Sequence, residues 1–136
     1  MINYLYSADS IQPEQLAGFF VGWPSPPSPE MHLESLRRSA EVVLALDDET
    51  DRVVGFVNAV SDGILSAYIP LLEVLPEYQG HGIGTRLTEL MLERLRNYYM
   101  VDLLCDSELQ PFYTRLNMLP MTGMAVRNYE AIRGGG

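Results

Sequence analysis

The sequence predicts one α/β domain with a mixed, mostly antiparallel central sheet and helices on both faces. Three apolar runs between residues 41 and 75 are separated by short polar turns, which is typical of an antiparallel meander. A glycine loop and a long amphipathic stretch follow, in the order strand, loop, helix. A further apolar run over 99–105 precedes a short helix, and such units place helices on the faces of a sheet.

The first forty residues predict one strand and two helices. Residues 2–6 alternate as a strand does, and a helix is expected over about residues 11–20. Four prolines within residues 24–29 predict a stiff loop that could wall a substrate pocket. Ser28 is expected to cap a second helix that runs to about residue 39.

The remaining pattern predicts strands over 41–46, 53–60, 64–75, 99–105 and, as one or two short strands, 118–129. Pro70 cannot donate to a strand ladder, so a bulge or break is expected there. Apolar positions from Ile83 to Tyr98 recur at helical spacing. A short helix, capped by Asp106 or Ser107, should end near Asn117, a residue type that tolerates the left-handed conformation. Residues 131–136 are expected to form a flexible tail of the single domain 1–136.

The composition narrows the class of partner. The chain has 136 residues and a net charge of −9, which disfavours nucleic acid and anionic membranes as partners. The charge suits a cationic substrate, although solubility alone also explains it. No apolar run is long enough for a membrane span, and the N-terminus lacks the pattern of a signal peptide. The single cysteine, Cys105, fits a reducing compartment, and we expect a cytoplasmic protein.

The glycine loop predicts a phosphate-binding site. Glycines before a helix aim backbone N–H groups at one point, and the helix dipole adds positive charge there. A nucleoside-triphosphate loop would need Lys and Ser or Thr after Gly84, where this chain has Thr85 and Arg86. A dinucleotide fingerprint would need different glycine spacing.

The pattern that remains, Gln-x-x-Gly-x-Gly from Gln79 to Gly84, resembles the acetyl-CoA pyrophosphate loop of the GNAT superfamily of N-acetyltransferases. A second segment, Phe112-Tyr113-Thr114-Arg115-Leu116-Asn117-Met118, is similar to the later Phe-Tyr-x-x-Leu-Gly-Phe segment of that family, at the usual spacing. The resemblance covers about residues 41–129. Residues 1–40 match only in the order of their elements.

The resemblance implies a GNAT-like fold and acetyl transfer from acetyl-CoA, as co-substrate, to a primary amine by direct attack. Pantetheine would lie in a slot between the strand at 72–74 and the strand at 103–104. The cofactor-contacting residues that the resemblance implies are Leu72, Val74, Leu75, Gln79, Gly80, His81, Gly82, Ile83, Gly84, Thr85 and Asp106. The acceptor would be a small-molecule or peptide amine.

Two residues are candidates for proton transfer. By resemblance, the Tyr113 hydroxyl would donate a proton to the leaving thiolate, and the alternative is a core tyrosine. Glu73 is a lone carboxylate in an apolar strand and lies on the face opposite Leu72 and Val74. If partly buried, Glu73 would serve as the general base, and the alternative is an exposed residue on a half-solvated strand. The Val74 N–H is a candidate to polarise the acyl carbonyl.

Other reactive side chains have simpler interpretations. His81 is expected to be solvated, and His32 to lie at the surface of the second helix rather than in an acceptor pocket. Cys105 is expected to be a small buried apolar residue rather than a nucleophile. No Cys or His cluster has metal-ligand spacing, so no metal site is predicted.

Three departures from the family pattern affect the site. Asp106 replaces an Asn that often contacts pantetheine, and Asn117 replaces a Gly. The segment after Met118 is short, which leaves the acceptor site open or completed by another subunit, as in a homodimer. Two alternatives to acetyl transfer stay open: a non-catalytic acyl-CoA-binding regulatory module, and an acyltransferase for longer acyl groups.

Overall fold

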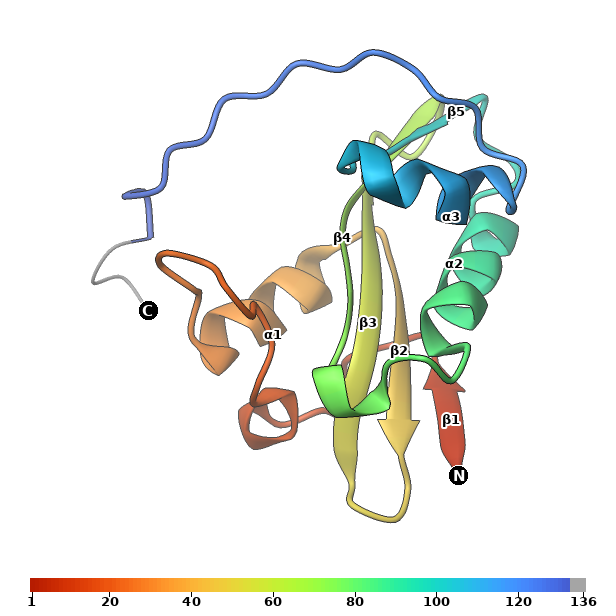
Figure 1. Ribbon diagram of the computed structural model, residues 1–136. Coiled ribbons are helices and arrows are strands. Elements are labelled where there is room, and N and C mark those ends of the chain that lie inside the picture. Colours follow the sequence, from red (N-terminus) through yellow and green to blue (C-terminus); the bar gives the residue numbers. More distant parts are fainter. Residues whose placement is uncertain (133–136) are drawn as a thin grey trace.

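The structure, a computed structural model, describes residues 1–132 and contains one five-stranded sheet in the order β1-β2-β3-β4-β5. The strands are β1 Ile2–Leu5, β2 Glu41–Asp47, β3 Arg52–Ser61, β4 Ser66–Val74 and β5 Met100–Asp102. The first four pair antiparallel, and β4 pairs with β5 in parallel. The prediction of a mixed, mostly antiparallel sheet is confirmed (Figure 1).

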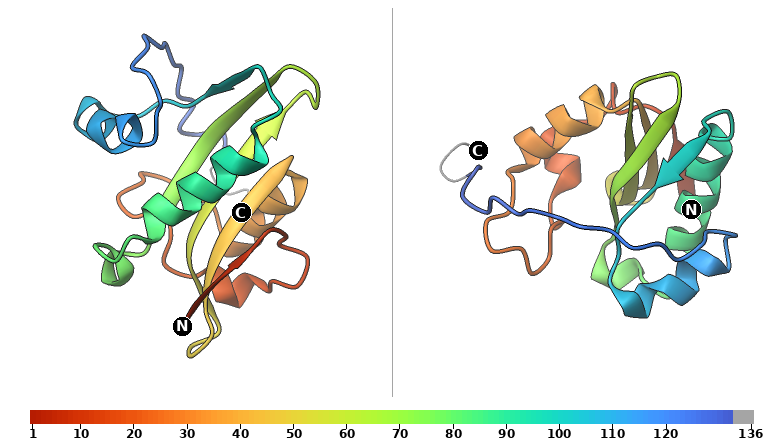
Figure 2. Two further views of the ribbon diagram at one scale, coloured as in Figure 1. Left: turned by 90° about the vertical axis from the view of Figure 1, so that its right-hand side faces the viewer. Right: turned by 90° about the horizontal axis from the view of Figure 1, so that it is seen from above.

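Helices cover both faces of this sheet. The helices are α1 Pro29–Arg38, α2 Ile83–Arg94 and α3 Gln110–Thr114, and the 3₁₀ turns are η1 Pro13–Leu16, η2 Pro76–Tyr78 and η3 Ser107–Leu109. The view from above in Figure 2 shows α1 and α2 on opposite sides of the sheet. Among the described residues, no helix is long and apolar enough to cross a membrane.

Local sequence chemistry explains α1. The Ser28 hydroxyl accepts a hydrogen bond from the Met31 N–H at 3.1 Å, which confirms the predicted cap. One face of the helix carries the buried residues His32, Leu33 and Leu36. The last turn contains two arginines, whose charge is favourable at a helix C-terminus.

The second major helix packs on the opposite face through residues spaced four apart. Ile83, Leu87, Met91 and Leu95 are all buried. The helix lies close to β3 at Gly55, where an added Cβ would lie 3.0 Å from Leu87 Cδ1. This glycine therefore brings the N-terminal half of α2, and the glycine loop before it, against the sheet.

A bulge occurs in β4 at the predicted place. Asn58 of β3 pairs with Leu71, and Val60 pairs with Tyr68. One β3 residue therefore opposes two β4 residues, Ile69 and Pro70. The missing N–H of proline explains why the ladder shifts at this point.

The expected helix over 11–20 is wrong, because only the short turn η1 forms there. Gly18 has φ +98° and Phe20 has φ +65°, and neither value is compatible with a continuing right-handed helix. The chain instead turns toward the end of β4, where an added Cβ at Gly18 would lie 3.3 Å from Leu75 Cδ2.

Two predictions near the C-terminus are also wrong. The expected buried strand over 99–105 is only β5, and it is short because it pairs with β4 solely over Ser66–Tyr68. Residues 118–129 contain no strand. Asn117 does adopt the left-handed conformation, with φ +69°. Of the expected flexible tail, residues 133–136 lie outside the described part of the chain.

Candidate active site

The glycine loop lies between η2 and α2 and leaves backbone N–H groups unpaired. Gly80 and Gly82 have φ +83° and +82°, a conformation that glycine adopts without steric cost. Gly82 is the N-cap of α2, and no side chain caps the helix there. The first N–H groups of α2 therefore remain without intrahelical partners, next to the positive end of the helix dipole. An added Cβ would meet nothing within 4 Å at either glycine, so the space in front of the loop is open.

Two contacts fix the loop to the end of β4. The Gln79 side-chain amide donates to the Val74 carbonyl at 3.0 Å. A Cβ at Gly84 would lie 3.7 Å from Val74 and 4.0 Å from Phe112, so this glycine fits between β4 and α3. His81 is exposed, as expected, and its Nδ1 lies 3.2 Å from the Tyr78 carbonyl.

The sheet opens along the second half of β4, before the strand reaches the glycine loop. Pairing between β4 and β5 ends at Tyr68 and Asp102, whereas β4 continues to Val74. Strand β4 and the segment after β5 diverge there, and a groove of about 460 Å³ lies between them. Its walls come from β4, from the segment after β5, from α3 and from the chain after α3; they include Leu71, Leu72, Leu103, Leu104, Cys105, Asp106 and Tyr113.

The register of β4 decides which of its backbone groups face the groove. The Leu75 N–H donates to Val54 of β3 at 2.8 Å. Because hydrogen-bonding direction alternates along a strand, the backbone groups of Leu72 and Val74 point away from β3. Leu75 itself is buried, and its N–H is already bonded to β3. Leu72 and Val74 are thus the β4 residues that can offer sheet-like bonds to a ligand.

Tyr113 reaches the groove from α3 and is half-buried. Burial, with a smaller contribution from the nearby Cys105 thiol, raises the pKa of its hydroxyl above the ordinary value of 10. The hydroxyl is therefore protonated at neutral pH and available as a donor. The Phe112 ring packs edge-on against it, with centroids 4.9 Å apart.

Asp106 is the N-cap residue of η3, lies at the same wall of the groove and is exposed. Its backbone carbonyl accepts from the Leu109 N–H at 2.9 Å, but its side chain makes no capping bond. Asp106 therefore occupies the cap position that was expected for Asp106 or Ser107, but it caps without a side-chain hydrogen bond. The carboxylate instead borders the groove.

Glu73 lies on β4 between Leu72 and Val74 and points to the other face. Its two carboxylate oxygens accept from the Phe20 N–H at 2.9 and 3.0 Å, and one accepts from the Val21 N–H at 3.3 Å. The residue is half-buried rather than exposed. This carboxylate holds the loop that contains the left-handed Phe20, a contact that sequence reasoning missed because 53 residues separate the partners.

His32 was expected at the surface, and this prediction is wrong. The side chain is only 1% exposed. It lies among the rings of Phe19, Phe20 and Phe56, with centroids 5.6, 4.7 and 4.4 Å away. Neither ring nitrogen has a hydrogen-bond partner among the described residues. The helical period could have revealed this, because His32 shares a face with Leu36, four residues later.

The metal-binding residue types do not gather at this site in the part of the chain that the structure describes. Among residues 1–132, no group of three or more His, Cys, Asp or Glu could hold a metal ion. Cys105 is half-buried at the groove rather than in the core. The arrangement can therefore bind an anionic, elongated ligand between the glycine loop and the groove, with a phenol donor at the groove wall.

Comparison with known proteins gives one consistent result. The model of the acetyltransferase (GNAT) family matches residues 8–118. A Deinococcus radiodurans R1 protein, whose crystal structure was assigned as an acetyltransferase, is 45% identical and superimposes with a TM-score of 0.91 over 95% of this chain and 90% of its own. A GNAT family acetyltransferase from Streptococcus pneumoniae TIGR4 is 31% identical, with a TM-score of 0.75 over 94% of this chain and 98% of its own.

Curated sequences agree with this result. A histone acetyltransferase of Glycine max is 31% identical over 108 residues, which are 71% of this chain and 46% of that protein. An uncharacterized N-acetyltransferase of Porphyra purpurea is 26% identical over 103 residues, or 73% of this chain and 59% of its own. The chain thus spans about half the length of the curated relatives that it matches.

Proposed function

Because the chain belongs to the GNAT family of acetyltransferases, we propose that it transfers an acetyl group from acetyl-CoA to a primary amine. The observation that carries the proposal is the position of the uncapped glycine loop, which is bonded to Val74 at the end of β4, the strand that forms one wall of the groove. An anionic pyrophosphate fits the loop, and a narrow pantetheine chain fits the groove. The single cysteine fits a reducing compartment, and we propose that the reaction takes place in the cytoplasm.

The glycine loop is proposed to bind the pyrophosphate through backbone N–H groups between Gly80 and Thr85. Local dipoles are needed there because the net charge of −9 repels an anion at long range. Leu72 and the Val74 carbonyl, which keeps a second lone pair beside its bond from Gln79, would then bond the pantetheine amides as an added strand does. Asp106, at the opposite wall, is proposed as a further contact.

The acyl group would sit where the two strands part. The amine nitrogen attacks the thioester carbonyl carbon directly, and the Val74 N–H is proposed to stabilise the developing oxyanion. The carbon–sulfur bond then breaks, and the thiolate takes the proton of the Tyr113 hydroxyl. Burial raises the pKa of Tyr113, so its hydroxyl is protonated at neutral pH and is a hydrogen-bond donor to the sulfur as the carbon–sulfur bond breaks.

Glu73 is proposed as the base that accepts the proton from the ammonium, directly or through water. Its oxygens already accept bonds from Phe20 and Val21, but Oε1 accepts only from the Phe20 N–H and retains a further lone pair. The same bonds make Glu73 the anchor of the loop at residues 18–23. The kinetics of Glu73→Gln distinguish the two roles: loss of a base lowers kcat, whereas a loosened loop raises KM and leaves kcat unchanged.

The acceptor is proposed to be a cationic small-molecule or peptide amine. The strongly acidic chain attracts a cation, and the half-exposed Trp23 beside Phe20 offers an aromatic face to an ammonium. The Glycine max relative is named for action on histone, which is a protein amine acceptor. A panel of candidate acceptors should therefore include a peptide amine.

Free-thiol release from acetyl-CoA in the presence of an amine panel tests the proposal. Tyr113→Phe should lower kcat about 100-fold or more while the Kd for acetyl-CoA stays unchanged, and Tyr6→Phe serves as the matched control. All nine basic residues are arginine, so no lysine of the chain itself accepts acetyl groups. Tight acetyl-CoA binding without turnover on any amine would instead favour a regulatory acyl-CoA-binding module.

A further inference from the structure

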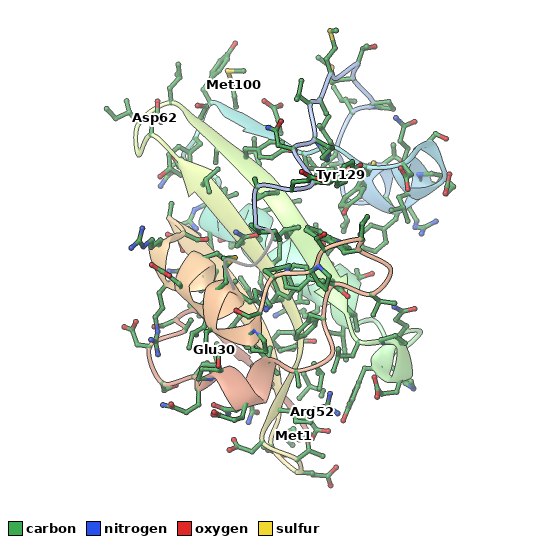
Figure 3. The ribbon with its side chains drawn as sticks, turned by 90° about the vertical axis from the view of Figure 1, so that its left-hand side faces the viewer. Met1, Glu30, Arg52, Asp62, Met100 and Tyr129 are labelled. Atoms are coloured by element: carbon green, nitrogen blue, oxygen red, sulfur yellow. The ribbon has the colours of Figure 1, made fainter. Side chains whose placement is uncertain are left out.

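The segment after α3 leaves the body of the protein, and we call residues 118–130 the arm. Figure 1 shows it passing the end of β5 and crossing to the side of the sheet that α1 covers, and Figure 3 shows Tyr129 on that side. The apolar side chains of the arm are strongly exposed: Leu119 81%, Met121 82%, Met124 96%, Val126 82% and Tyr129 61%. A segment this apolar is unfavourable in water unless something covers it.

The backbone of the arm is also largely unpaired. Met118 N–H donates to the Tyr113 carbonyl at 3.2 Å, and Ala131 N–H donates to Asn128 at 3.0 Å. Between these two bonds, no backbone hydrogen bond ties residues 119–127 to the described chain. The sequence pattern predicts strands here, and a strand needs a partner for its N–H and C=O groups.

A free sheet edge lies close to this unpaired segment. The Met100 N–H donates to the Leu65 carbonyl at 3.2 Å, so the backbone of Val101 points to the other side of β5. No described strand lies on that side. Four exposed apolar side chains surround the start of this edge, and we call them the tip patch: Ile64 83%, Leu65 52%, Tyr99 86% and Met100 43%.

The arm also belongs to the groove. Gly123, Met124, Ala125 and Arg127 form part of its lining. Gly123 packs so closely on Leu104 that an added Cβ would overlap that side chain. The inner side of the arm is therefore fixed by the groove, and its outer side is the one that stays uncovered.

We propose that a second copy of the chain covers the arm, with the outer side of each arm lying on the β5 edge and tip patch of the other copy. Each chain carries both an arm and a β5 edge with its tip patch. A dimer with a twofold axis therefore forms the arm-on-edge contact twice and buries twice the area. The arm would then be held between its own groove and the partner, and the second copy would complete the wall of the proposed acetyl-transfer site.

The arrangement of the arm has a counterpart in the Deinococcus radiodurans crystal structure. The superposition leaves about 5% of 136 residues, or about 7, uncovered, which is fewer than the 13 residues of the arm. Part of the arm is therefore matched in that relative. Pairing of the arm with its own β5 would require it to turn back beside Met100, whereas it continues past Leu104 toward the α1 side.

Sedimentation of the intact chain tests the association without any assay of acetyl transfer. The wild-type protein should have twice the mass of one 15.3 kDa chain. Met121→Asp should weaken self-association at least tenfold, whereas Met121→Leu should not. Because Met121 is 82% exposed in one chain and does not line the groove, neither change should alter the thermal midpoint of the dissociated protein. A monomeric wild type, or a dimer that Met121→Asp leaves unchanged, overturns the proposal.

Mixed disulfide trapping tests the geometry. Val126→Cys and Met100→Cys, each combined with Cys105→Ser, are purified separately, mixed and oxidised. The proposal predicts a disulfide-linked heterodimer, and Glu34→Cys on α1 in place of Met100→Cys should give none. Absence of the heterodimer refutes the arm-on-edge contact. A monomeric disulfide in the Val126→Cys/Met100→Cys chain would show that the arm folds onto its own β5.

Discussion

The buried His32 makes the stability of the fold depend on pH. Its ring is surrounded by Phe19, Phe20 and Phe56 and offers two unpaired nitrogens. Burial lowers the pKa of this imidazole from 6.5 to about 4. Between pH 6.5 and pH 4 the unfolded chain takes up a proton at His32 and the folded chain does not. The stability that depends on neutral His32 is therefore fully present above pH 6.5 and is lost as the pH falls toward 4.

The size of the effect follows from the two pKa values. At pH 5 the unfolded state gains about 2 kcal/mol from protonation that the folded state cannot match, and at pH 7 it gains only about 0.2 kcal/mol. Below pH 4 the loss approaches about 3 kcal/mol. A domain with a typical stability of about 5–15 kcal/mol would show this change clearly.

Urea unfolding of the wild type and His32→Leu at pH 7 and pH 5 measures the effect. Leucine has a similar volume and no polar atoms, so the variant should lose about 2 kcal/mol less than the wild type between these pH values. The matched control is His81→Gln, because His81 is exposed and is the only other histidine. If the wild type and His32→Leu lose equal stability, the ring is not held neutral in the aromatic cluster and the reasoning fails.

Three further substitutions test the fold and the loop. Ser28→Ala removes the cap of α1 and should cost about 1 kcal/mol in urea unfolding; no loss would show that the 3.1 Å bond contributes nothing. Gly55→Ala places a Cβ 3.0 Å from Leu87 and should cost about 1–3 kcal/mol, a value that unchanged stability would contradict. Gly82→Ala strains a residue at φ +82°, so it should cost about 1–2 kcal/mol of stability and weaken acetyl-CoA binding. Gly84→Ala is the control, because its added Cβ makes only ordinary contacts and binding should be retained. Equal effects of the two changes on binding would refute the role of the left-handed turn.

Local patterns predicted the elements that local chemistry determines. Ser28 and the following proline mark the start of α1, and the spacing of apolar residues marks α2. Pro70 predicted the bulge in β4, because a residue without an N–H cannot donate a ladder hydrogen bond to any neighbouring strand. Asn117 predicted the left-handed end of the α3 region for the same kind of reason.

Features set by distant contacts could not be predicted in this way. The bond from Glu73 to Phe20 joins residues 53 positions apart and depends on two left-handed turns that no periodicity reveals. The length of β5 is limited by the opening of the sheet rather than by its own apolar sequence. The residues of the arm have the composition of a strand, but the strand lacks a partner within the described chain.

Calorimetric titration with acetyl-CoA, desulfo-CoA and ATP tests the central claim most directly. The account predicts tight binding of both CoA species, because both carry the pyrophosphate and the pantetheine chain that the loop and groove fit, and much weaker binding of ATP. Failure of both CoA species to bind would contradict the account and leave the glycine loop of this GNAT fold without its proposed ligand.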